Sequence, residues 1–371
     1  MVCPICGKLY CDHSPTERGQ STEEMITDSV FPHKLINNKT IKLTKKLRGL
    51  PNTAADFDWS KLFMITMAVP YECNYHCLKC AFTESKSKQH LPLDRKVRIV
   101  EEAAELGARL LLIEGEGEPF LSNELKPLVS TANRKGLTSL VFTNGSVFNK
   151  DNISFCYDHD VSLIVSLDSL DEDTYNLLTQ TREQLPKVLE NLNQLRRHYA
   201  PSLRRVEDKI ITRLALTSLI SLQNRGQLRE LSDFCGEDML YLCNTPLYEG
   251  TARDNWEVLT GISPTTEHTN IHNSKFKELK EKYTQGPLQI LRRNMGGCAL
   301  LQNGIELTSD GRVLLCAGAR SIQLGDTRSE SLSEIWKKKK KFLSQYDLSE
   351  ITCFPREKPE LYQELIGVKH D

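Results

Sequence analysis

The chain has 371 residues, of which 39% are hydrophobic and 26% are charged, and its formal net charge is −1. This composition is typical of an ordinary globular protein, and the length suggests two or three structural units. The near-neutral charge excludes a global field that would attract nucleic acid or an anionic membrane.

Targeting signals and cysteine usage indicate the compartment. No stretch reaches the ~20 apolar residues that a membrane-spanning helix needs. The first residues also lack the charged start and apolar core of a secretory signal. Twelve cysteines in a chain of this kind predict reduced thiols that bind metal in the cytoplasm, in an anaerobic or well-reduced setting.

Residues 1–58 form the first expected unit, a cysteine-rich knuckle followed by a polar connector that wraps the core. Cys3 and Cys6 lie in a C-P-x-C-G pattern, which is a recurring metal-binding knuckle, and Cys11 and His13 follow closely. The four side chains form a structural zinc site in one interpretation. A further iron–sulfur cluster and a disordered tail are the alternatives.

Between residues 59 and 250, short apolar runs alternate with amphipathic stretches. We expect strands at 62–69, 110–113, 139–143, 161–167, 210–217 and 239–243. We expect helices at 94–106, 122–135, 150–158, 184–198 and 226–234, and a short one near Glu172. Six strand–helix repeats predict an α/β fold, a partial (β/α)6 TIM-like barrel whose functional residues lie at the carboxyl ends of the strands.

Three cysteines with the spacing C-x3-C-x2-C follow the first expected strand: Cys73, Cys77 and Cys80. A disulfide framework would leave one thiol unpaired, and a structural zinc site usually takes four ligands from two distant pairs. Three thiolates on one tight loop instead suit three corners of a [4Fe–4S] cluster with one open iron. A zinc knuckle and unrelated core cysteines are the alternatives.

This stretch resembles the signature of the radical S-adenosylmethionine (radical SAM) superfamily. The resemblance implies a six-unit partial barrel and a cluster whose open iron binds the amino and carboxylate groups of S-adenosylmethionine. One electron from the cluster then releases methionine and a 5′-deoxyadenosyl radical. Many members have an aromatic residue near the adenine where this chain has Lys79, and Phe82 is its substitute here.

The loop after the second expected strand resembles the G-G-E-P loop of the family, with Glu116 in place of a glycine. The resemblance implies that this loop contacts the amino group of S-adenosylmethionine, through Gly115, Glu116, Gly117, Glu118 and Pro119. Two glycines permit close backbone approach, and carboxylates accept hydrogen bonds from an ammonium group. A turn with solvated glutamates is the alternative.

Four further residues at or near strand ends are candidates. Asn144 lies in a T-N-G turn, and Ser166 and Asp168 lie in an S-L-D segment. Both segments resemble segments at the same places in members of the family. Asp168 or Ser169 is alternatively a helix cap. Arg213 is the single charge in the fifth apolar run and pairs with the carboxylate of S-adenosylmethionine, or else is a strand-edge arginine. Candidate general bases, by position, are Glu116, Asp168 and Glu249.

Residues 251–290 are expected to be a linker with a helix near 275–283, and residues 291–371 a C-terminal unit. In this unit Asp310-Gly311 predicts a hairpin. The pattern C-x12-G-x4-C from Cys298 to Cys316 resembles the twitch or SPASM extension of the family.

That resemblance implies an auxiliary [4Fe–4S] cluster with Cys353 as its third ligand. Either Cys235 or Cys243 is its fourth ligand, or one iron is open to substrate. Residues 337–341 are all lysine and follow a helical pattern, which favours a solvated helix face over a phosphate-binding patch.

We therefore expect a radical SAM enzyme with S-adenosylmethionine, its [4Fe–4S] cluster, an auxiliary cluster and possible zinc at the N-terminus as cofactors. An auxiliary cluster favours oxidation, so we expect dehydrogenation of a small molecule such as a sugar or an aminocyclitol. A flavodoxin or ferredoxin is the expected electron donor. The alternatives are a maturase of ribosomal peptides and a non-catalytic zinc or iron–sulfur protein that binds RNA.

Overall fold

The computed structural model describes residues 61–69, 72–82, 90–206, 209–263, 298–346, 348 and 353–367. The candidate zinc ligands Cys3, Cys6, Cys11 and His13 lie outside the described residues, as does the helix expected at 275–283.

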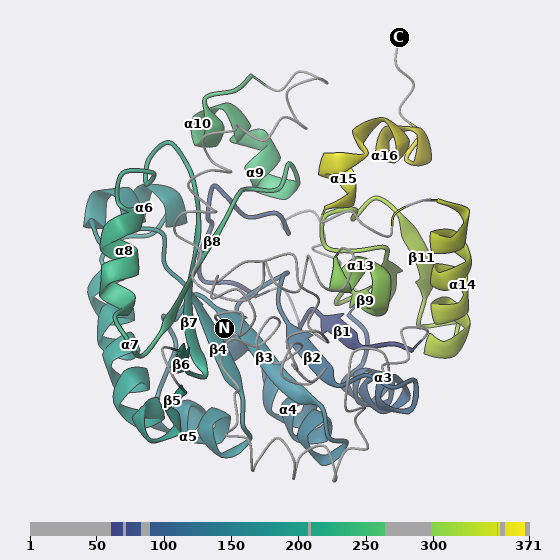
Figure 1. The fold of residues 1–371 in the computed structure, drawn as a ribbon, viewed down its shortest axis with the longest axis horizontal. Coiled ribbons are helices and arrows are strands. Elements are labelled where there is room, and N and C mark those ends of the chain that lie inside the picture. Colours follow the sequence, from purple (N-terminus) through teal and green to yellow (C-terminus); the bar gives the residue numbers. More distant parts are fainter. Residues whose placement is uncertain are drawn as a thin grey trace, which may run out of the picture.

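Six parallel strands form the centre of the fold. In spatial order they are β1 (Met64–Met67), β2 (Leu110–Ile113), β3 (Thr138–Thr143), β4 (Ser162–Ser166), β7 (Leu214–Leu219) and β8 (Leu240–Asn244). The connecting helices are α3 (Leu93–Glu105), α4 (Leu125–Arg134), α5 (Lys150–Asp158), α6 (Glu172–Thr179), α7 (Leu185–Tyr199) and α8 (Leu228–Cys235). They cover the outer face of the curved sheet (Figure 1). The predicted partial barrel is confirmed.

The two faces of the sheet have different surroundings. Side chains such as Ile65, Leu111 and Val165 pack with the helices in the main core. Alternate side chains, such as Met64, Leu112 and Ile164, form a smaller apolar cluster on the other face. Since side chains alternate along a strand, the second set lies inside the barrel. The side chains on this inner face become polar at the carboxyl ends of the strands, and the site lies there.

The C-terminal unit continues the same sheet. Strand β9 (Gly304–Leu307) pairs in parallel with β1, and β10 (Arg312–Leu314) and β11 (Gln323–Asp326) follow as antiparallel neighbours. Gly311 has φ +95° in the turn between β9 and β10, which confirms the predicted hairpin. The helices of this unit are α13 (Ala299–Asn303), α14 (Leu332–Gln345), α15 (Phe354–Glu357) and α16 (Pro359–Leu365).

Two stretches differ from the prediction. The expected strand at 210–217 is divided, because β5 (Arg204–Val206) and β6 (Lys209–Ile211) form a separate antiparallel pair and β7 begins at Leu214. The start of the expected linker is helical, as α9 (Gly250–Asp254) and α10 (Trp256–Thr260), because Ala252, Trp256 and Leu259 are buried there. Among the described helices, none is long and apolar enough to span a membrane.

Candidate active site

A cavity of about 420 Å³ opens at the carboxyl ends of the parallel strands. Most of its wall comes from the loops after β1, β2, β3, β4, β7 and β8, and a smaller part comes from the C-terminal unit. The predicted site residues that line it are Cys73, Cys77, Cys80, Phe82, Gly115, Gly117, Glu118, Asn144, Ser166 and Cys353. The topology therefore brings together residues that lie up to 280 positions apart, from Cys73 to Cys353.

The loop that carries the first three cysteines is fixed by the T-N-G turn after β3. Asn144 donates to the Asn74 side chain at 2.9 Å, and Asn74 donates to Ser146 Oγ at 2.8 Å. Burial raises the pKa of the Cys73 thiol, and a hydrogen bond from the Asn144 side chain to its sulfur opposes part of that shift. Asn144 thus orients the loop and one of its sulfurs.

The other side of the cysteine loop rests on α6 and α9. The backbone N–H of His76 donates to Thr179 O, and that of Leu78 to Leu178 O. Gly250, at the start of α9, approaches so closely that a Cβ there would lie 2.8 Å from the carbonyl carbon of Ala81 and 2.9 Å from Cys80 O. Its φ of +53° also favours glycine.

Glu118 connects the loops after β2 and β3. Its carboxylate accepts from Thr143 Oγ1 at 2.7 Å, Asn144 N at 2.7 Å and Phe120 N at 3.1 Å. Burial raises its pKa to about 7, against the effect of these bonds. Pro119, which begins the following turn of 3-10 helix (Pro119–Leu121), is also buried. Since the chain itself occupies both carboxylate oxygens, the side chain of Glu118 orients the G-E-P loop.

Lys79 takes the place where the family often has an aromatic residue, and it interacts with the end of β4. Its ammonium donates to Ser166 Oγ at 3.1 Å and forms a buried ion pair with Asp168. Asp168 also accepts from Leu219 N at 2.9 Å, and only 1% of it is exposed. Asp168 does not line the cavity, so the structure does not support its expected role as a base.

Glu116 turns toward the C-terminal unit. It accepts from Arg320 Nη2 at 3.1 Å and from Ser309 N at 3.0 Å, and Arg320 also pairs with Glu306 on β9 at 3.4 Å. The Arg320 guanidinium lies 4.7 Å from the centre of the Phe82 ring. The Glu116 side chain therefore joins the two units, and the structure does not support its expected contact with the amino group of S-adenosylmethionine.

Glu114 lines the cavity and was missed as a candidate. It extends the row of side chains from Leu110 and Leu112 into the barrel, and this alternation was the signal that could have identified it. Burial raises its pKa to about 7, and Arg320 lowers it. In the part of the chain that the structure describes, no side chain or backbone group hydrogen-bonds its carboxylate.

Cys298, Cys316 and Cys353 form the second cysteine group, and Cys316 lies within charge-interaction range of the other two. Burial raises the pKa of Cys316 to about 12, and the nearby Lys339 ammonium lowers it. Cys353 also lines the cavity. One member of the second group therefore reaches the cavity that the first group lines.

Arg213 is not at this site. Its guanidinium donates to the carbonyls of Cys156, Tyr157 and Val161 at 3.1, 2.9 and 3.2 Å and pairs with Asp160 at 3.4 Å. These groups precede β4, whereas the cavity lies beyond its end. The structure therefore does not support the expected pairing of Arg213 with S-adenosylmethionine.

Three other expectations also change. Glu249 accepts from Tyr362 Oη at 3.3 Å and does not line the cavity, so it joins α9 to α16. Cys235 and Cys243 are buried in the main core beside α8 and β8, where they interact with each other. Neither is near Cys316, whose sulfur neighbours are Cys298 and Cys353, so neither supplies a fourth ligand.

The residue types at both places fit iron–sulfur clusters. Each place holds three free thiols, and all described cysteines are free. Within the described ranges, no three His, Cys, Asp or Glu side chains converge on a single metal ion. Three thiolates from one place suit three corners of a [4Fe–4S] cluster.

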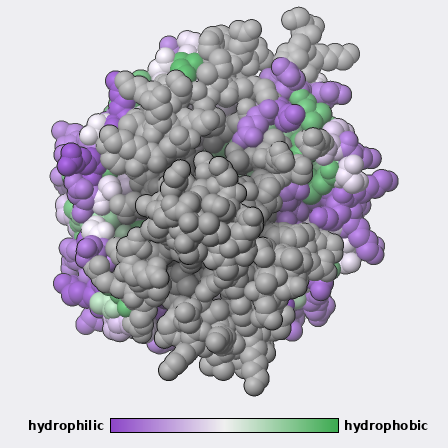
Figure 2. Space-filling model, in the orientation of Figure 1, coloured by the Kyte–Doolittle hydropathy of each residue, from purple (hydrophilic) through white to green (hydrophobic). Residues whose placement is uncertain are grey.

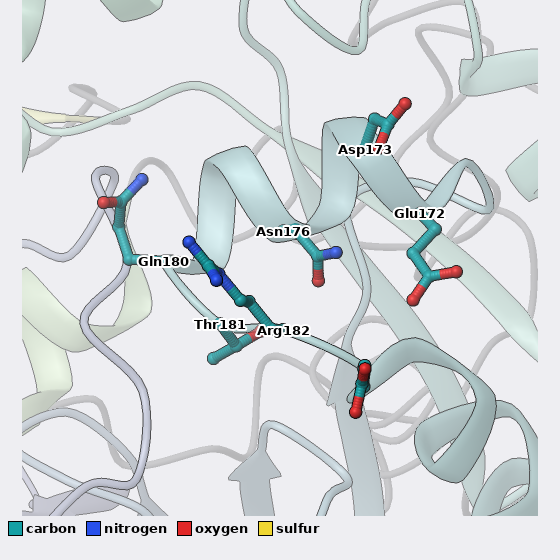
Figure 3. Close-up of a pocket in the computed structure, with 7 residues that line it drawn as sticks. Glu172, Asp173, Asn176, Gln180, Thr181 and Arg182 are labelled. Carbon is teal, nitrogen blue, oxygen red and sulfur yellow. The ribbon is translucent and has the colours of Figure 1, made fainter.

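A second hollow of about 630 Å³ lies beside α6, and no cysteine of either group lines it. Its lining is polar and includes Glu172, Asp173, Asn176 and Arg182 (Figure 3). None of the expected site residues reaches it, so we assign it no function. The described residues visible in Figure 2 are mainly hydrophilic, and the hydrophobic ones appear in small separate patches.

Comparison with known proteins agrees with this geometry. The model of the radical SAM superfamily matches residues 67–210, and that of SPASM, an iron–sulfur cluster-binding domain, matches residues 298–356. The S-adenosylmethionine-dependent nucleotide dehydratase of Lacinutrix mariniflava is 34% identical over 124 residues, which are 31% of this chain and 25% of that protein. The protein of the same name from Flammeovirga pacifica is 30% identical over 129 residues, or 33% and 44% of the two chains.

Among solved structures, Streptococcus suis SuiB bound to its precursor peptide SuiA has a TM-score of 0.51 at 16% identity. The alignment covers 82% of this chain and 71% of SuiB. At this identity the likeness concerns the fold alone.

Proposed function

Since the chain belongs to the radical SAM superfamily and carries a C-terminal SPASM-like auxiliary cluster domain, we propose that this enzyme dehydrogenates a small hydroxylated molecule. The substrate class that we propose is a sugar or an aminocyclitol. The observation that carries the proposal is the shared cavity, because Cys73, Cys77 and Cys80 line one side of it and Cys353 lines another.

Oxidation of an alcohol to a ketone removes a hydrogen atom from carbon, then one proton and one electron. When bound, the SAM cluster with S-adenosylmethionine supplies the radical that abstracts hydrogen, and the auxiliary cluster supplies an electron acceptor. The protein has to hold both groups beside the substrate, exclude water and accept the proton.

The two cysteine groups and the loops that fix them would hold the clusters and S-adenosylmethionine beside the substrate. Cys73, Cys77 and Cys80 would hold the cluster that binds S-adenosylmethionine, and Cys298, Cys316 and Cys353 would hold the auxiliary one. The G-E-P loop and Ser166 would contact S-adenosylmethionine, since Gly115, Gly117 and Ser166 line the cavity. Phe82 lies against Gly115, where a Cβ would be 3.3 Å from its ring, and is the candidate for the adenine contact.

Glu114 is the group that we propose as proton acceptor. The other carboxylates near the cavity are occupied by the chain: Glu118 by three donors, Asp168 by Lys79 and Leu219, and Glu116 by Arg320 and Ser309. Among the described residues no donor hydrogen-bonds the Glu114 carboxylate, and Arg320 acts on it only through its charge. A carboxylate with a pKa raised to about 7 by burial is suited to general-base work near neutral pH.

The charge of the cavity supports the substrate class. Apart from the cysteines, its charged described lining residues are Lys79, Glu114 and Glu118, and Lys79 is already paired with Asp168. Unpaired cations would favour a phosphorylated substrate, whereas an amine or a neutral polyol is compatible with these carboxylates.

Isotope transfer tests the proposal. The anaerobically reconstituted enzyme, S-adenosylmethionine and a reductant are incubated with ring-deuterated scyllo-inosamine, glucosamine and scyllo-inositol. We expect deuterium in 5′-deoxyadenosine and a carbonyl product from at least one of them. Glu114→Gln should retain deuterium transfer but form at least about tenfold less carbonyl product, because a missing general base typically costs 10²–10⁴-fold.

The same assay is run separately with substrates of other classes. Deuterium transfer from a nucleoside triphosphate, with none from the three probes, would overturn the substrate class. A redox-neutral product would overturn the oxidation. A precursor peptide that alone gives deuterium transfer would favour the peptide maturase; SuiB, whose fold is similar, binds a precursor peptide.

A further inference from the structure

One lysine of helix α14 is buried, although it belongs to a run that the sequence suggests is solvated. Lys337, Lys338 and Lys341 are exposed, whereas Lys339 is 0% exposed. Lys339 follows Leu332, Ile335 and Trp336 at helical spacing, so it lies on the apolar face of the helix. Complete burial of a lysine is costly unless its ammonium is hydrogen-bonded and its charge compensated.

The hydrogen bonds of Lys339 show both its charge and its position. Nζ donates to Leu300 O at 2.9 Å, Gly304 O at 2.7 Å and Leu315 O at 2.7 Å. Three acceptors require three N–H groups, so the side chain is an ammonium ion. Leu300 and Gly304 follow Cys298 closely, and Leu315 directly precedes Cys316. One ammonium therefore joins the two segments that carry these cysteines.

The charge of Lys339 has no carboxylate partner at ion-pair distance in the part of the chain that is described. The ionisable groups that act on it most strongly are Cys316 and Cys298, ahead of Glu306. Its natural counter-charge is thus the second cysteine group.

We propose that Lys339 positions and charge-compensates the auxiliary iron–sulfur cluster, holding two of its ligand segments together and raising its reduction potential. The proposal rests on the auxiliary site of the proposed function but not on the substrate or the reaction. Three thiolates and a [4Fe–4S]²⁺ core carry one net negative charge, and one-electron reduction adds another. A fixed positive charge nearby stabilises the reduced cluster more than the oxidised one, because net charge and surroundings set the potential of such clusters.

The test uses the full chain with Cys73, Cys77 and Cys80 changed to Ala, so that only the auxiliary cluster remains. Lys339→Gln removes the charge but keeps two N–H donors, Lys339→Arg keeps the charge, and Lys340→Gln is the control. Iron per chain and the midpoint potential from EPR-monitored titration are measured. We expect about four irons in the parent, a more negative potential in Lys339→Gln, a smaller shift in Lys339→Arg and none in the control.

The other outcomes are also decisive. Loss of iron in Lys339→Gln but not in Lys339→Arg would support a requirement for the charge during assembly. An unchanged or more positive potential in a loaded Lys339→Gln protein would overturn the proposal, as would equal loss of iron in both variants. A parent without iron would reject the auxiliary site itself, which distinguishes failure of the proposed function from failure of this inference.

Discussion

Lys79 and Asp168 form a buried ion pair that ties the loop of the first three cysteines to the end of β4. Their side chains are 9% and 1% exposed. Removing one partner of a buried pair leaves the other charge uncompensated, which typically costs about 3–5 kcal/mol. This pair therefore makes the position of the cysteine loop depend on a residue that does not line the cavity.

We predict that Asp168→Asn lowers the thermal midpoint by several degrees and weakens binding of S-adenosylmethionine about tenfold or more. The reason is that the Lys79 ammonium, adjacent to Cys80, loses its counter-charge and its fixed position. Calorimetry of S-adenosylmethionine binding and thermal unfolding would measure the two effects. Asp173→Asn, an exposed change on α6, is the control. Unchanged affinity in Asp168→Asn would contradict the positioning role.

Gly250→Ala should selectively disturb the first cluster. The added Cβ would meet the backbone of Ala81 and Cys80 at 2.8–2.9 Å, and the positive φ adds strain. Because backbone atoms cannot move aside without shifting the loop, we expect the variant to lose most of the iron at Cys73, Cys77 and Cys80 and to keep the auxiliary cluster. Iron analysis would show about four atoms per chain instead of about eight.

The matched control for this change is Gly226→Ala. At Gly226 an added Cβ meets nothing within 4 Å, so full iron content is expected. Equal iron content in both variants would show that the close approach of α9 does not determine the position of the cysteine loop.

Substitution of the cysteines tests the ligand assignments directly. The Cys73/Cys77/Cys80→Ala variant and the Cys298/Cys316/Cys353→Ala variant should each retain about four of about eight irons, because each group would hold one cluster. Only the second variant should still cleave S-adenosylmethionine reductively. Full iron content after substitution of the second group would mean that its cysteines are not cluster ligands.

Most features of the fold and the site that can be predicted from the sequence have a local pattern in the chain. The spacing of Cys73, Cys77 and Cys80 and the turn at Asp310-Gly311 depend on neighbours in the chain, so both appear as expected. The pairing of β9 with β1 joins residues about 240 positions apart and has no local signal.

The expectations that the structure does not support fail for the same reason, because they depend on residues far apart in the chain. Arg213 lies in an apolar run, but three carbonyls hold it before the start of β7. Glu116 belongs to a conspicuous loop, but an arginine from the C-terminal unit pairs with it. Lys339 could have been identified from its helical spacing to Ile335 and Trp336, but the run of five lysines obscured that signal.

Three glutamates, Glu114, Glu116 and Glu306, surround Arg320 and make the stability of the protein depend on pH. Burial raises the pKa of Glu306 to about 8 and that of Glu114 to about 7, and the repulsion of Glu306 by Glu114 and Glu116 adds to the effect at Glu306. Glu306 is 3% exposed, and its Oε2 atom has no hydrogen-bond partner. The folded protein therefore holds protons on these carboxyls at pH values where the unfolded chain has released them.

Stability from this source is fully present below the ordinary pKa of about 4.5 and is lost as pH rises toward about 8. Glu306→Gln removes one titrating group, so we expect a smaller fall in thermal midpoint between pH 5.5 and 8.5. At pH 8.5 the free energy of unfolding of the variant should exceed that of the wild type by on the order of a few kcal/mol, since one pKa unit corresponds to about 1.4 kcal/mol. Glu105→Gln, exposed on α3, should follow the wild type. Identical pH profiles for Glu306→Gln and wild type would show that Glu306 is ionised throughout this range and that Arg320 compensates it fully.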